Sequence, residues 1–315
     1  MTMLRIRSFQ KGADEEIYVR IFNAAFSDYD DMRSITLEEV RAIEDAPSFN
    51  LEGVLIGEWD GQVAGMVQAH VDKARKDKKG FIQHLSVLPE FRHKGIAREL
   101  LRTSVSLLKD KGMKIASAWA QTNRSACTHL YASFGFKRVR TSSMMKRSLE
   151  QSTESKADML TDFREARLSE EKEIALINYL DNETFKEHFN YRRMSVEETR
   201  YLLLKSPFWQ YQKAWFALHE KQPIGYVVAG VDERLNREKG AKYGWILNIG
   251  VLKPYRQRDV GTNLMYRAMS HLREQGMEDA LLYVDDENPT HAMKLYEKVG
   301  FKVHHKSGSY ELELT

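Results

Sequence analysis

The sequence predicts an α/β protein in which one unit, a mixed sheet with helices on both faces, occurs twice in tandem. Two observations lead to this prediction. An internal repeat runs through the chain, and each half shows the same order of strand and helix patterns. The length of 315 residues fits two domains of ordinary size.

The internal repeat is collinear. Matching residues lie 159 positions apart near the start of each half (Asn23 and Asn182) and 165 positions apart near its end (Tyr131 and Tyr296). The separation only increases along the chain, which is what a few added loop residues would produce. We therefore interpret the chain as a tandem duplication. Further matched pairs are Phe26 with Phe185, Glu39 with Glu198, Gly65 with Gly225, Gly112 with Gly276, and Gly135-Phe136 with Gly300-Phe301.

Hydrophobic periodicity predicts the elements of the first half. Asp60-Gly61, which separates two apolar runs, is a strong signal for a β-hairpin. Hairpin strands together with strands separated by helices indicate a mixed sheet. The expected strands are 4–9, 53–59, 62–72, 80–87, 114–120, 136–140 and 143–149, and the expected helices are 15–26, 36–45, 94–111 and 124–133.

The second half repeats this order. Between the halves, the polar segment 150–158 lacks periodicity and is typical of a linker. We therefore expect a first domain of residues 1–149 and a second of residues 159–315. The expected strands of the second domain are 160–164, 214–219, 224–232, 243–251, 280–285, 301–305 and 309–314, and its helices are 169–185, 196–204, 260–275 and 289–298.

The turn at Arg92–Ala97, between a predicted strand and the central helix, indicates an anion-binding site. Backbone N–H groups at a helix N-terminus have no partner within the helix, and the helix dipole favours negative charge there. Gly95 and the small Ala97 would let a phosphate approach the backbone, and Arg92 and Lys94 add positive charge.

Composition narrows the possible functions. The net charge of +3 gives no support to a general role in nucleic-acid binding. The single cysteine, Cys127, excludes an intrachain disulfide and a cysteine-rich zinc site, and no metal site is expected. The N-terminus has no apolar signal region and no stretch is apolar enough to span a membrane, so we expect a cytoplasmic protein without membrane or nucleic-acid partners.

Two motifs together resemble a known family. The first is the turn Arg92-x-x-Gly95-x-Ala97, and the second is Asn123-x7-Tyr131-x3-Gly135-Phe136; the second motif occurs again as Asn288-x7-Tyr296-x3-Gly300-Phe301. Strand, turn, helix, strand and this second motif, at the same distance in both halves, resemble the GNAT superfamily of N-acetyltransferases. The resemblance covers essentially the whole chain, and two such units in one chain are similar to the layout of mycothiol synthase.

The resemblance implies acetyl-CoA as co-substrate, bound where strands 80–87 and 114–120 splay apart. The pantetheine arm would pair with the backbone of the fourth strand, and the pyrophosphate would lie on the N–H groups of the turn. Tyr131 matches the position that donates a proton to the departing thiolate, and His84 is a candidate general base. The cofactor-binding residues implied for the first half are Leu85, Ser86, Val87, Arg92, His93, Lys94, Gly95, Ile96, Ala97, Arg98 and Asn123.

In the second half the proton donor would be Tyr296. The sequence departs from the family pattern at Asp259, which stands where Gly95 stands in the first half. A carboxylate there adds a Cβ and a negative charge to a phosphate loop, unless it points outward and favours the helix N-terminus. The implied cofactor-binding residues are Ile249, Gly250, Val251, Gln257, Arg258, Asp259, Val260, Gly261, Thr262 and Asn288.

The implied reaction is direct attack of a neutral amine, from a small molecule or a peptide, on the thioester in a ternary complex. The acceptor cleft is expected beside residues 26–31 and 185–191, where Asp28, Asp30 and Asp31 either attract a cationic amine or are simply solvated. The main alternative is an acyl-CoA-binding or sensing protein with one or both units non-catalytic. A third possibility is that one half binds the acceptor while the other acetylates it. The protein would be a monomer or a homodimer.

Overall fold

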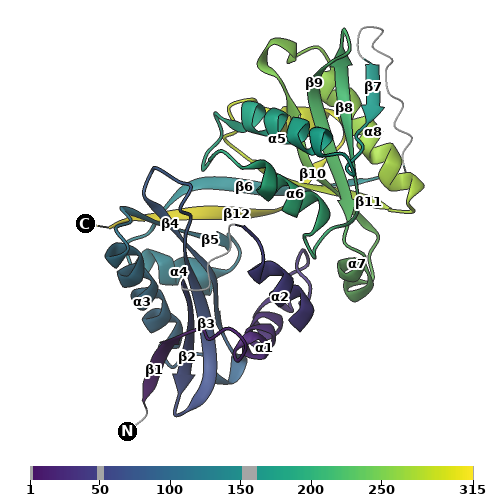
Figure 1. Ribbon diagram of the computed structural model, residues 1–315. Helices are drawn as coiled ribbons and strands as arrows, with labels where there is room; N and C mark the ends of the chain where they lie inside the picture. The colour runs from purple at the N-terminus through teal and green to yellow at the C-terminus, as the bar shows by residue number, and fades with distance from the viewer. Residues whose placement is uncertain (1–2, 48–52, 151–161, 315) are drawn as a thin grey trace. The chain divides into compact units, whose positions relative to one another are not determined.

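The computed structural model describes residues 3–47, 53–150 and 162–314, which form two compact units. Unit 1 comprises the described residues up to Arg140 together with those from Ser307 onward, and unit 2 comprises Thr141–Lys306. Both units are mixed α/β structures, as expected (Figure 1). Among the described residues, no helix is both long and apolar enough to cross a lipid bilayer.

The sheet of unit 1 has the strand order β1-β2-β3-β4-β5-β12. Neighbouring strands are antiparallel except for the parallel pair β4 and β5. Its strands are β1 (Leu4–Ser8), β2 (Val54–Trp59), β3 (Gln62–Val71), β4 (Lys79–Val87), β5 (Ile115–Gln121) and the last part of β12 (Lys302–Glu313), and its helices are α1 (Glu15–Phe26), α2 (Leu37–Glu44), α3 (Ile96–Asp110) and α4 (Ser125–Ser133).

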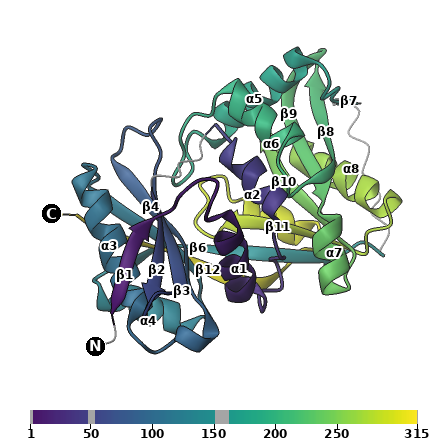
Figure 2. The same cartoon turned by 60° about the horizontal axis from the view of Figure 1, so that its bottom comes forward.

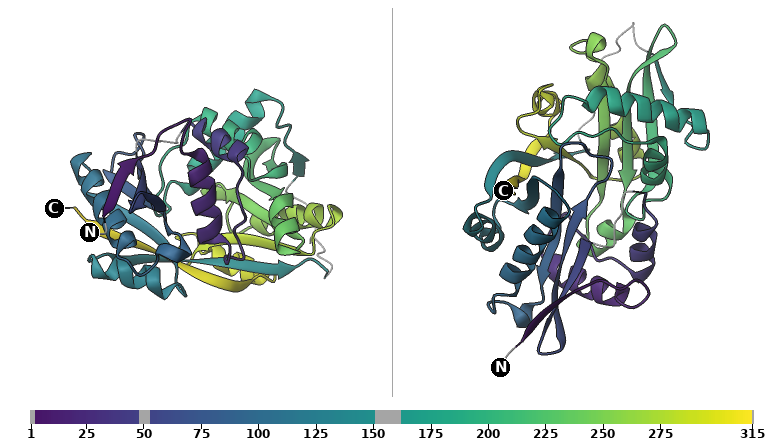
Figure 3. Two further views of the ribbon diagram at one scale, coloured as in Figure 1. Left: turned by 90° about the horizontal axis from the view of Figure 1, so that it is seen from below. Right: turned by 60° about the vertical axis from the view of Figure 1, so that its left-hand side comes forward.

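Helices cover both faces of this sheet. Helix α3 lies on one face, and α1 and α2 lie on the other (Figure 3). Helix α3 buries Ile96, Leu100, Leu101 and Leu108 at helical spacing against β3 and β4. Each such side chain contributes about 1.5–3 kcal/mol when fully buried, so this stripe fixes the helix, and with it the preceding turn, on the sheet.

Unit 2 repeats the architecture with the strand order β6-β11-β10-β9-β8-β7. Helices α5 and α6 and helix α8 lie on opposite faces of its sheet (Figure 2). Its strands are β6 (Lys137–Ser148), β7 (Asp162–Glu165), β8 (Gln210–His219), β9 (Gln222–Val231), β10 (Tyr243–Val251) and β11 (Asp279–Asp285), and its helices are α5 (Glu171–Phe185), α6 (Val196–Leu204), α7 (Glu233–Lys239), α8 (Val260–Glu274) and α9 (Ala292–Lys298).

The two units exchange their last strands. Residues Ser142–Ser148 of β6 pair with β11 of unit 2, whereas Ser307–Glu313 of β12 pair with β5 of unit 1. The expectation of two strands in 136–149, and again in 301–314, is therefore wrong, because β6 and β12 are each one continuous strand that passes from one unit into the other. The units thus differ from the expected linear division into 1–149 and 159–315, and of the expected linker 150–158 only Glu150 is among the described residues.

A short helix was not expected from the sequence. Helix α7 follows β9, and the Asp232 carboxylate accepts hydrogen bonds from the N–H groups of Arg234 and Leu235 at its start. Gly240 ends the helix in the left-handed conformation, with φ of +60°. Helix α7 has 7 residues and buries Leu235 alone. A segment with one buried apolar residue shows no hydrophobic periodicity from which a helix could be predicted.

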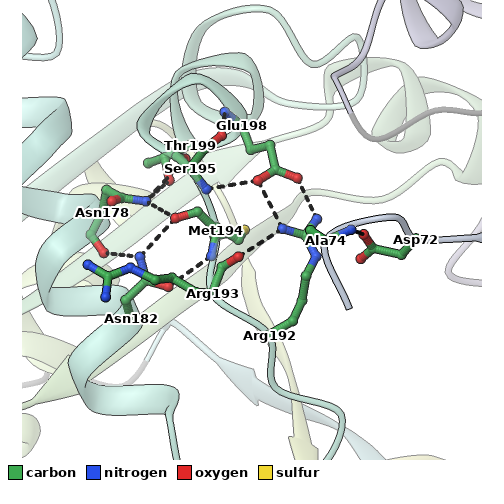
Figure 4. A network of polar contacts seen from close by, with 10 residues as sticks. All are labelled: Asp72, Ala74, Asn178, Asn182, Arg192, Arg193, Met194, Ser195, Glu198 and Thr199. Carbon is green, nitrogen blue, oxygen red and sulfur yellow. Dashed lines mark hydrogen bonds and ion pairs between the residues drawn. The ribbon is translucent and has the colours of Figure 1, made fainter. Parts of the chain in front are cut away.

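The repeated Asn and Glu residues anchor the loop between the first two helices of each unit. In unit 2, Asn182 donates to the carbonyl of Met194 (3.0 Å) and accepts from its N–H (2.9 Å), while Arg192 forms an ion pair with Glu198 (Figure 4). Ser195 and Glu198 form a capping box at the start of α6. In unit 1 the corresponding contacts are made by Asn23 with Ile35, Arg33 with Glu39, and Thr36 with Glu39.

Candidate active site

The parallel strands at the centre of each unit separate at one end. In unit 2, β10 and β11 pair only from Tyr243–Asp279 to Trp245–Leu281, although β10 continues to Val251. In unit 1, β4 and β5 pair from Lys79–Ile115 to Ile82–Ala118, although β4 continues to Val87. The backbone of the last part of β4 and of β10 is therefore turned away from the neighbouring ladder, and an extended ligand could pair with it as a further strand would.

A β-bulge lies at the point of separation in each unit. In β4 the register against β3 shifts between Ser86 and Gln83, and His84 there has a φ of +51°. In β10 the register shifts between Ile246 and Asn248. The matched glycines of the repeat lie opposite the strand ends beyond these bulges, since Gly65 pairs with Val87 and Gly225 with Val251. A Cβ at Gly65 would meet the carbonyl oxygen of Ser86 at 2.5 Å, so the position needs glycine.

The strand-to-helix turns form the same anion-binding geometry in both units. In unit 1, His93 and Gly95 have φ of +63° and +80°, and in unit 2, Gln257 and Asp259 have φ of +62° and +56°. The first backbone bond within α8 runs from the N–H of Asn263 to the carbonyl of Asp259, at 2.9 Å. The N–H groups of residues 260–262, and likewise 96–98 in α3, precede the first helical bond and are available to an anion.

Arginines brace these turns against the strand that precedes them. Arg256 donates through Nε to the carbonyl oxygen of Val251 (2.9 Å), and Arg92 makes the matching contact with Val87 (3.3 Å). The remaining basic side chains of the first turn lie over aromatic rings, Lys94 over Phe91 and Arg98 over Phe134. Arg258 likewise lies over Tyr255.

Asp259 adopts the conformation of Gly95, and its carboxylate is held by neighbouring side chains. Oδ1 accepts from Lys298 Nζ of α9 at 2.6 Å and from Thr262 Oγ1 at 3.2 Å. Its side chain is 64% exposed. The carboxylate is thus paired with a cation of α9, and aspartate is among the residues that tolerate positive φ.

A cavity of about 680 Å³ opens between the separated strands of unit 2. Its walls come from β10, the turn before α8, the end of β11, α9 and the end of α5. The predicted site residues that line it are Ile249, Gly250, Val251, Gln257, Asp259, Gly261, Thr262, Asn288 and Tyr296. Two predicted residues lie elsewhere: Val260 is buried in the hydrophobic core, and Arg258 lies over the Tyr255 ring.

The two candidate proton donors are buried tyrosines. Tyr296 of α9 lines the cavity and is 7% exposed, and burial raises the pKa of its phenol above the usual value. Tyr131 of α4 is 3% exposed and packs on Phe136 and Tyr310, and burial together with Cys127 and Tyr29 raises the pKa of its phenol well above 10. Both phenols therefore keep their protons at neutral pH.

Asn288 and Asn123 have different environments. The Asn288 Oδ1 atom accepts from the N–H (2.8 Å) and the hydroxyl (2.6 Å) of Thr290, so its side chain shapes the turn before α9 and leaves the amide nitrogen for other partners. Asn123 is exposed and precedes α4. A turn-forming role and a cofactor contact are compatible at Asn288.

His84 lies in a cage of aromatic side chains from α1. Its Nδ1 is 2.8 Å from the Tyr18 hydroxyl, and its ring is edge-on to Phe22 and Phe26. Burial lowers the pKa of His84 to about 4, so the imidazole is neutral at physiological pH. As a general base it would be weak, and one of its nitrogens is already engaged with Tyr18.

In unit 1, side chains bridge the loop after α1 and the segment that leads into α4. Arg124 donates to the carboxylate of Asp28 and, at 3.0 Å, to its backbone carbonyl, and its guanidinium lies 4.0 Å from the Tyr29 ring centroid. Gln121 donates to Asp31 at 3.3 Å. We call this set of contacts the Arg124 clamp. The expected acceptor-side carboxylates Asp28 and Asp31 are therefore partners of neighbouring side chains.

In unit 2, Glu187 stands at the position of Asp28 and Pro289 at the position of Arg124, so the Arg124 clamp has no equivalent pair there. Glu187 forms an ion pair with Lys253 instead (3.1 Å). The polar residues beneath the bulge also differ. The buried Asp181 of α5 accepts from the Tyr226 hydroxyl and from Asn248 Nδ2, where unit 1 has Phe22, Met66 and His84.

Comparison with known proteins agrees with this geometry. The model of the acetyltransferase (GNAT) family matches residues 16–136 and again residues 176–301. The chain belongs to this family. Each GNAT match falls on one of the two separated strand pairs and the strand-to-helix turn that follows its first strand, so the protein carries two GNAT units, as the sequence predicted.

The curated relatives of this GNAT protein include several mycothiol acetyltransferases. That of Thermomonospora curvata is 30% identical over 133 residues, which are 42% of this chain and 44% of the relative. That of Cellulomonas flavigena is 28% identical over 141 residues, 42% of this chain and 40% of the relative. The match thus covers half or less of the length of these curated relatives.

Solved structures share the fold over the whole chain. A tandem GNAT protein from the clavulanic acid biosynthesis pathway superimposes with a TM-score of 0.77 at 13% identity, over 100% of this chain and 99% of that one. A GCN5-related N-acetyltransferase from Sphaerobacter thermophilus gives a TM-score of 0.69 at 19% identity, over 99% of this chain and 96% of that one.

Sequence analysis missed two groups beside the candidate sites. His188 lines the cavity of unit 2, and Arg124 bridges to the loop after α1 in unit 1. His188 lies within the segment 185–191 that was expected to border the acceptor, but nothing singled it out. The available signal was the internal repeat, which aligns His188 with Tyr29. At this position the second half has an imidazole where the first half has a phenol.

Proposed function

We propose that this GNAT protein is an acetyl-CoA-dependent N-acetyltransferase and that unit 2 is a working catalytic unit. The observation that carries the proposal is the cavity of about 680 Å³, because the free part of β10, the N-terminus of α8 and the phenol of Tyr296 all border it. Binding and cleavage of an acyl-CoA thioester require a free strand edge for the pantetheine arm, an anion site for the pyrophosphate and a proton donor for the departing sulfur.

The donor would bind along these walls. The amides of the pantetheine arm would pair with backbone groups of residues 249–251, which β11 leaves free. The pyrophosphate would take the N–H groups at the start of α8, with Lys253, Lys294 and Lys298 among the cationic side chains around the cavity. The Lys298 contact with Asp259 offsets the carboxylate that departs from the family pattern.

The reaction would proceed by direct attack of an amine on the bound thioester. Holding both reactants in one cavity supplies much of the acceleration. Free N–H groups of the bulged strand would stabilise the negative charge that develops on the carbonyl oxygen. Tyr296 would protonate the departing sulfur, and its raised pKa means that the proton is present at neutral pH.

For unit 1, acyl-CoA binding without turnover is the second candidate function. The Arg124 clamp favours it, because this contact ties the loop after α1 to the segment beside Tyr131. The turn of unit 1 has the same conformation as that of unit 2, so retention of an anion site is compatible with a closed acceptor side.

We propose a primary amine, of a small molecule or a peptide, as acceptor. The name of the curated relatives, mycothiol acetyltransferase, supports a small-molecule acceptor. A cytoplasmic location, and a monomer or a homodimer as the oligomeric state, are also parts of this proposal.

The test measures CoA release from acetyl-CoA against a panel of primary amines, with calorimetric titration of acetyl-CoA in parallel. The matched variants Ala97→Glu and Gly261→Glu place a carboxylate at aligned positions of the two turns. We expect Gly261→Glu to abolish turnover and Ala97→Glu to leave it. Loss of turnover only in Ala97→Glu would reverse the assignment of the units, and absence of CoA release with every amine would refute the enzymatic function.

A further inference from the structure

We propose that His188 is the group in unit 2 that accepts the proton of the attacking amine. This inference rests on the proposed function, because it names the general base of that reaction. It assigns the role to the loop after α5, whereas the candidate base that sequence analysis named, His84, lies on the fourth strand of unit 1.

His188 and Tyr296 border the same cavity from opposite faces of the sheet. The segment that carries His188 follows α5, whose apolar residues pack in a cluster with Phe216, Tyr226 and Val228. Tyr296 packs in a separate cluster with the residues of α8. A thioester lying between the separated strands would therefore meet the phenol on one side and the imidazole on the other. That placement suits an acid at the leaving sulfur and a base at the incoming amine.

The loop that carries His188 is held in place at both ends. Its ring packs on Phe185 at a centroid distance of 4.5 Å, and its N–H donates to the Phe185 carbonyl at 2.8 Å. Further along, Asn178 and Asn182 bind the backbone of Met194, and Asn178 also binds that of Ser195 (Figure 4). The side chain is thus presented to the cavity by a braced loop, as a catalytic group requires.

The charge state of His188 suits a base. Burial and the nearby Arg256 lower the pKa of its imidazole below the usual 6.5, and the carboxylates of Asp285 and Glu187 oppose this shift. Arg256 comes from the turn before α8, Asp285 from the end of β11 and Glu187 from the same loop. The ring is therefore neutral at pH 7 and has a lone pair to accept a proton.

Other polar groups near the bulge are less suited. Asn248 lines the cavity, but an amide does not act as a base in this pH range. The Asp181 carboxylate already accepts from Tyr226 and Asn248 and is buried. Of Asn248, Asp181 and His188, only His188 combines a place in the cavity wall with a lone pair that is basic and has no hydrogen-bonded partner in this group.

Unit 1 provides an internal contrast. The residue aligned with His188 is Tyr29, which packs on Phe26 as His188 packs on Phe185. Its phenol lies close enough to influence the pKa of Tyr131, the residue aligned with Tyr296. Burial raises the pKa of Tyr29, so this group is protonated at neutral pH and cannot accept a proton. The pair Tyr29 and Tyr131 in unit 1 therefore corresponds to the pair His188 and Tyr296 in unit 2. Only the pair in unit 2 includes a group that can accept a proton at neutral pH.

Every proton of the acetyl-transfer step is accounted for. The amine nitrogen forms the C–N bond, the C–S bond breaks, and the thiolate takes the hydroxyl proton of Tyr296. The proton from the amine passes to the imidazole of His188, which returns it to the Tyr296 phenolate through solvent. The products are the N-acetylated amine and CoA with a free thiol, and both side chains regain their starting states.

The experiment compares wild type with His188→Gln and His188→Tyr, using the best amine found in the screen. His188→Tyr keeps an aromatic ring packed on Phe185 and introduces the residue that unit 1 has at the aligned position. Tyr29→Phe changes that aligned position in unit 1 and serves as the matched control. We expect both His188 variants to lower kcat by about 100-fold or more, with unchanged acetyl-CoA affinity in calorimetry. We expect the kcat/KM of wild type to fall below pH 6.5 more steeply than protonation of the amine alone requires, and both His188 variants to lose this additional acid limb. Tyr29→Phe should leave kcat and the pH profile unchanged.

The outcomes separate this inference from the function on which it rests. If wild type turns over but His188→Gln keeps its kcat and its acid limb, His188 is not the base and the acetyltransferase function stands. If a higher KM with unchanged kcat is the sole effect, His188 is a binding residue and the proposal is wrong. Restoration of activity to His188→Ala by added imidazole would support proton transfer, because a purely structural role would not respond. If wild type releases no CoA with any amine, the proposed function fails and this inference with it.

Discussion

Replacement of Asp259 by glycine tests how the turn proposed to bind the pyrophosphate tolerates a carboxylate. The residue lies at the N-terminus of α8 with a φ of +56°, and its carboxylate contacts Lys298 and Thr262. A positive φ costs an L-residue roughly 1–2 kcal/mol, and aspartate is at the low end of that range. Glycine removes this strain but loses roughly 0.5–1 kcal/mol in extra unfolded-state entropy. We therefore expect the free energy of unfolding of Asp259→Gly to stay within about 1 kcal/mol of wild type.

Binding should respond more than stability. A carboxylate and a phosphate about 4 Å apart repel each other by about 1 kcal/mol in a water-like medium, and the Asp259 side chain is 64% exposed. Removing the carboxylate should tighten acetyl-CoA binding to unit 2 by about 1 kcal/mol, which is roughly fivefold. Isothermal titration measures it in an Ala97→Glu background, where the turn of unit 1 is blocked.

A double-mutant cycle with Lys298 makes the test decisive. Lys298→Ala alone should weaken binding several-fold, because Asp259 then has no cation of α9 opposite it. In the Asp259→Gly background the same change should have a smaller effect. The reasoning is refuted if Asp259→Gly weakens binding as much as Lys298→Ala does, since the ion pair would then support the turn as a structural unit.

Three further predictions concern the two tyrosines, the histidine of β4 and the Arg124 clamp. Tyr296→Phe should lower kcat by about 10²–10⁴-fold with an unchanged acetyl-CoA Kd, whereas Tyr131→Phe should leave turnover intact; equal losses in a CoA-release assay would argue for two working units. The unfolded chain protonates His84 near pH 6.5 and the folded chain near pH 4, so stability should fall by up to about 3 kcal/mol as the pH drops through this window, and His84→Asn should flatten that part of the curve in urea denaturation. Arg124→Ala should increase amide hydrogen exchange in residues 27–35, and unchanged exchange there would show that the clamp does not hold the loop.

Most elements could be predicted because their apolar residues follow a clear period. Helices 15–26 and 196–204 and strand 243–251 were expected with the bounds that the structure has. The repeat also indicated which residues share a role, since Asn23 and Asn182 make the same contacts to a loop backbone. The positions of the turns followed from glycine, proline and helix-start residues next to apolar runs.

Other features depend on contacts between residues far apart in sequence. Nothing in Thr141–Ser142 indicates that β6 continues to Ser148 and pairs with β11, a strand far along the chain. The outward orientation of the Asp259 carboxylate depends on Lys298 of another helix. The side of the sheet from which His188 meets the cavity is likewise a property of the packing of α5. Local pattern carries no information on these points.

The exchanged strands mean that the duplicated halves cannot be studied as separate proteins. Cutting the chain between them would leave β5 without Ser307–Glu313 and Tyr131 without Tyr310, so a half-chain would report on a damaged sheet as well as on a missing partner. During synthesis, β5 must also wait for almost the entire second half to emerge before it gains this neighbour. Such a long-range closure slows folding and leaves a strand edge open to other chains meanwhile. Point substitutions in the full-length chain, rather than truncations, are therefore the proper way to silence one unit.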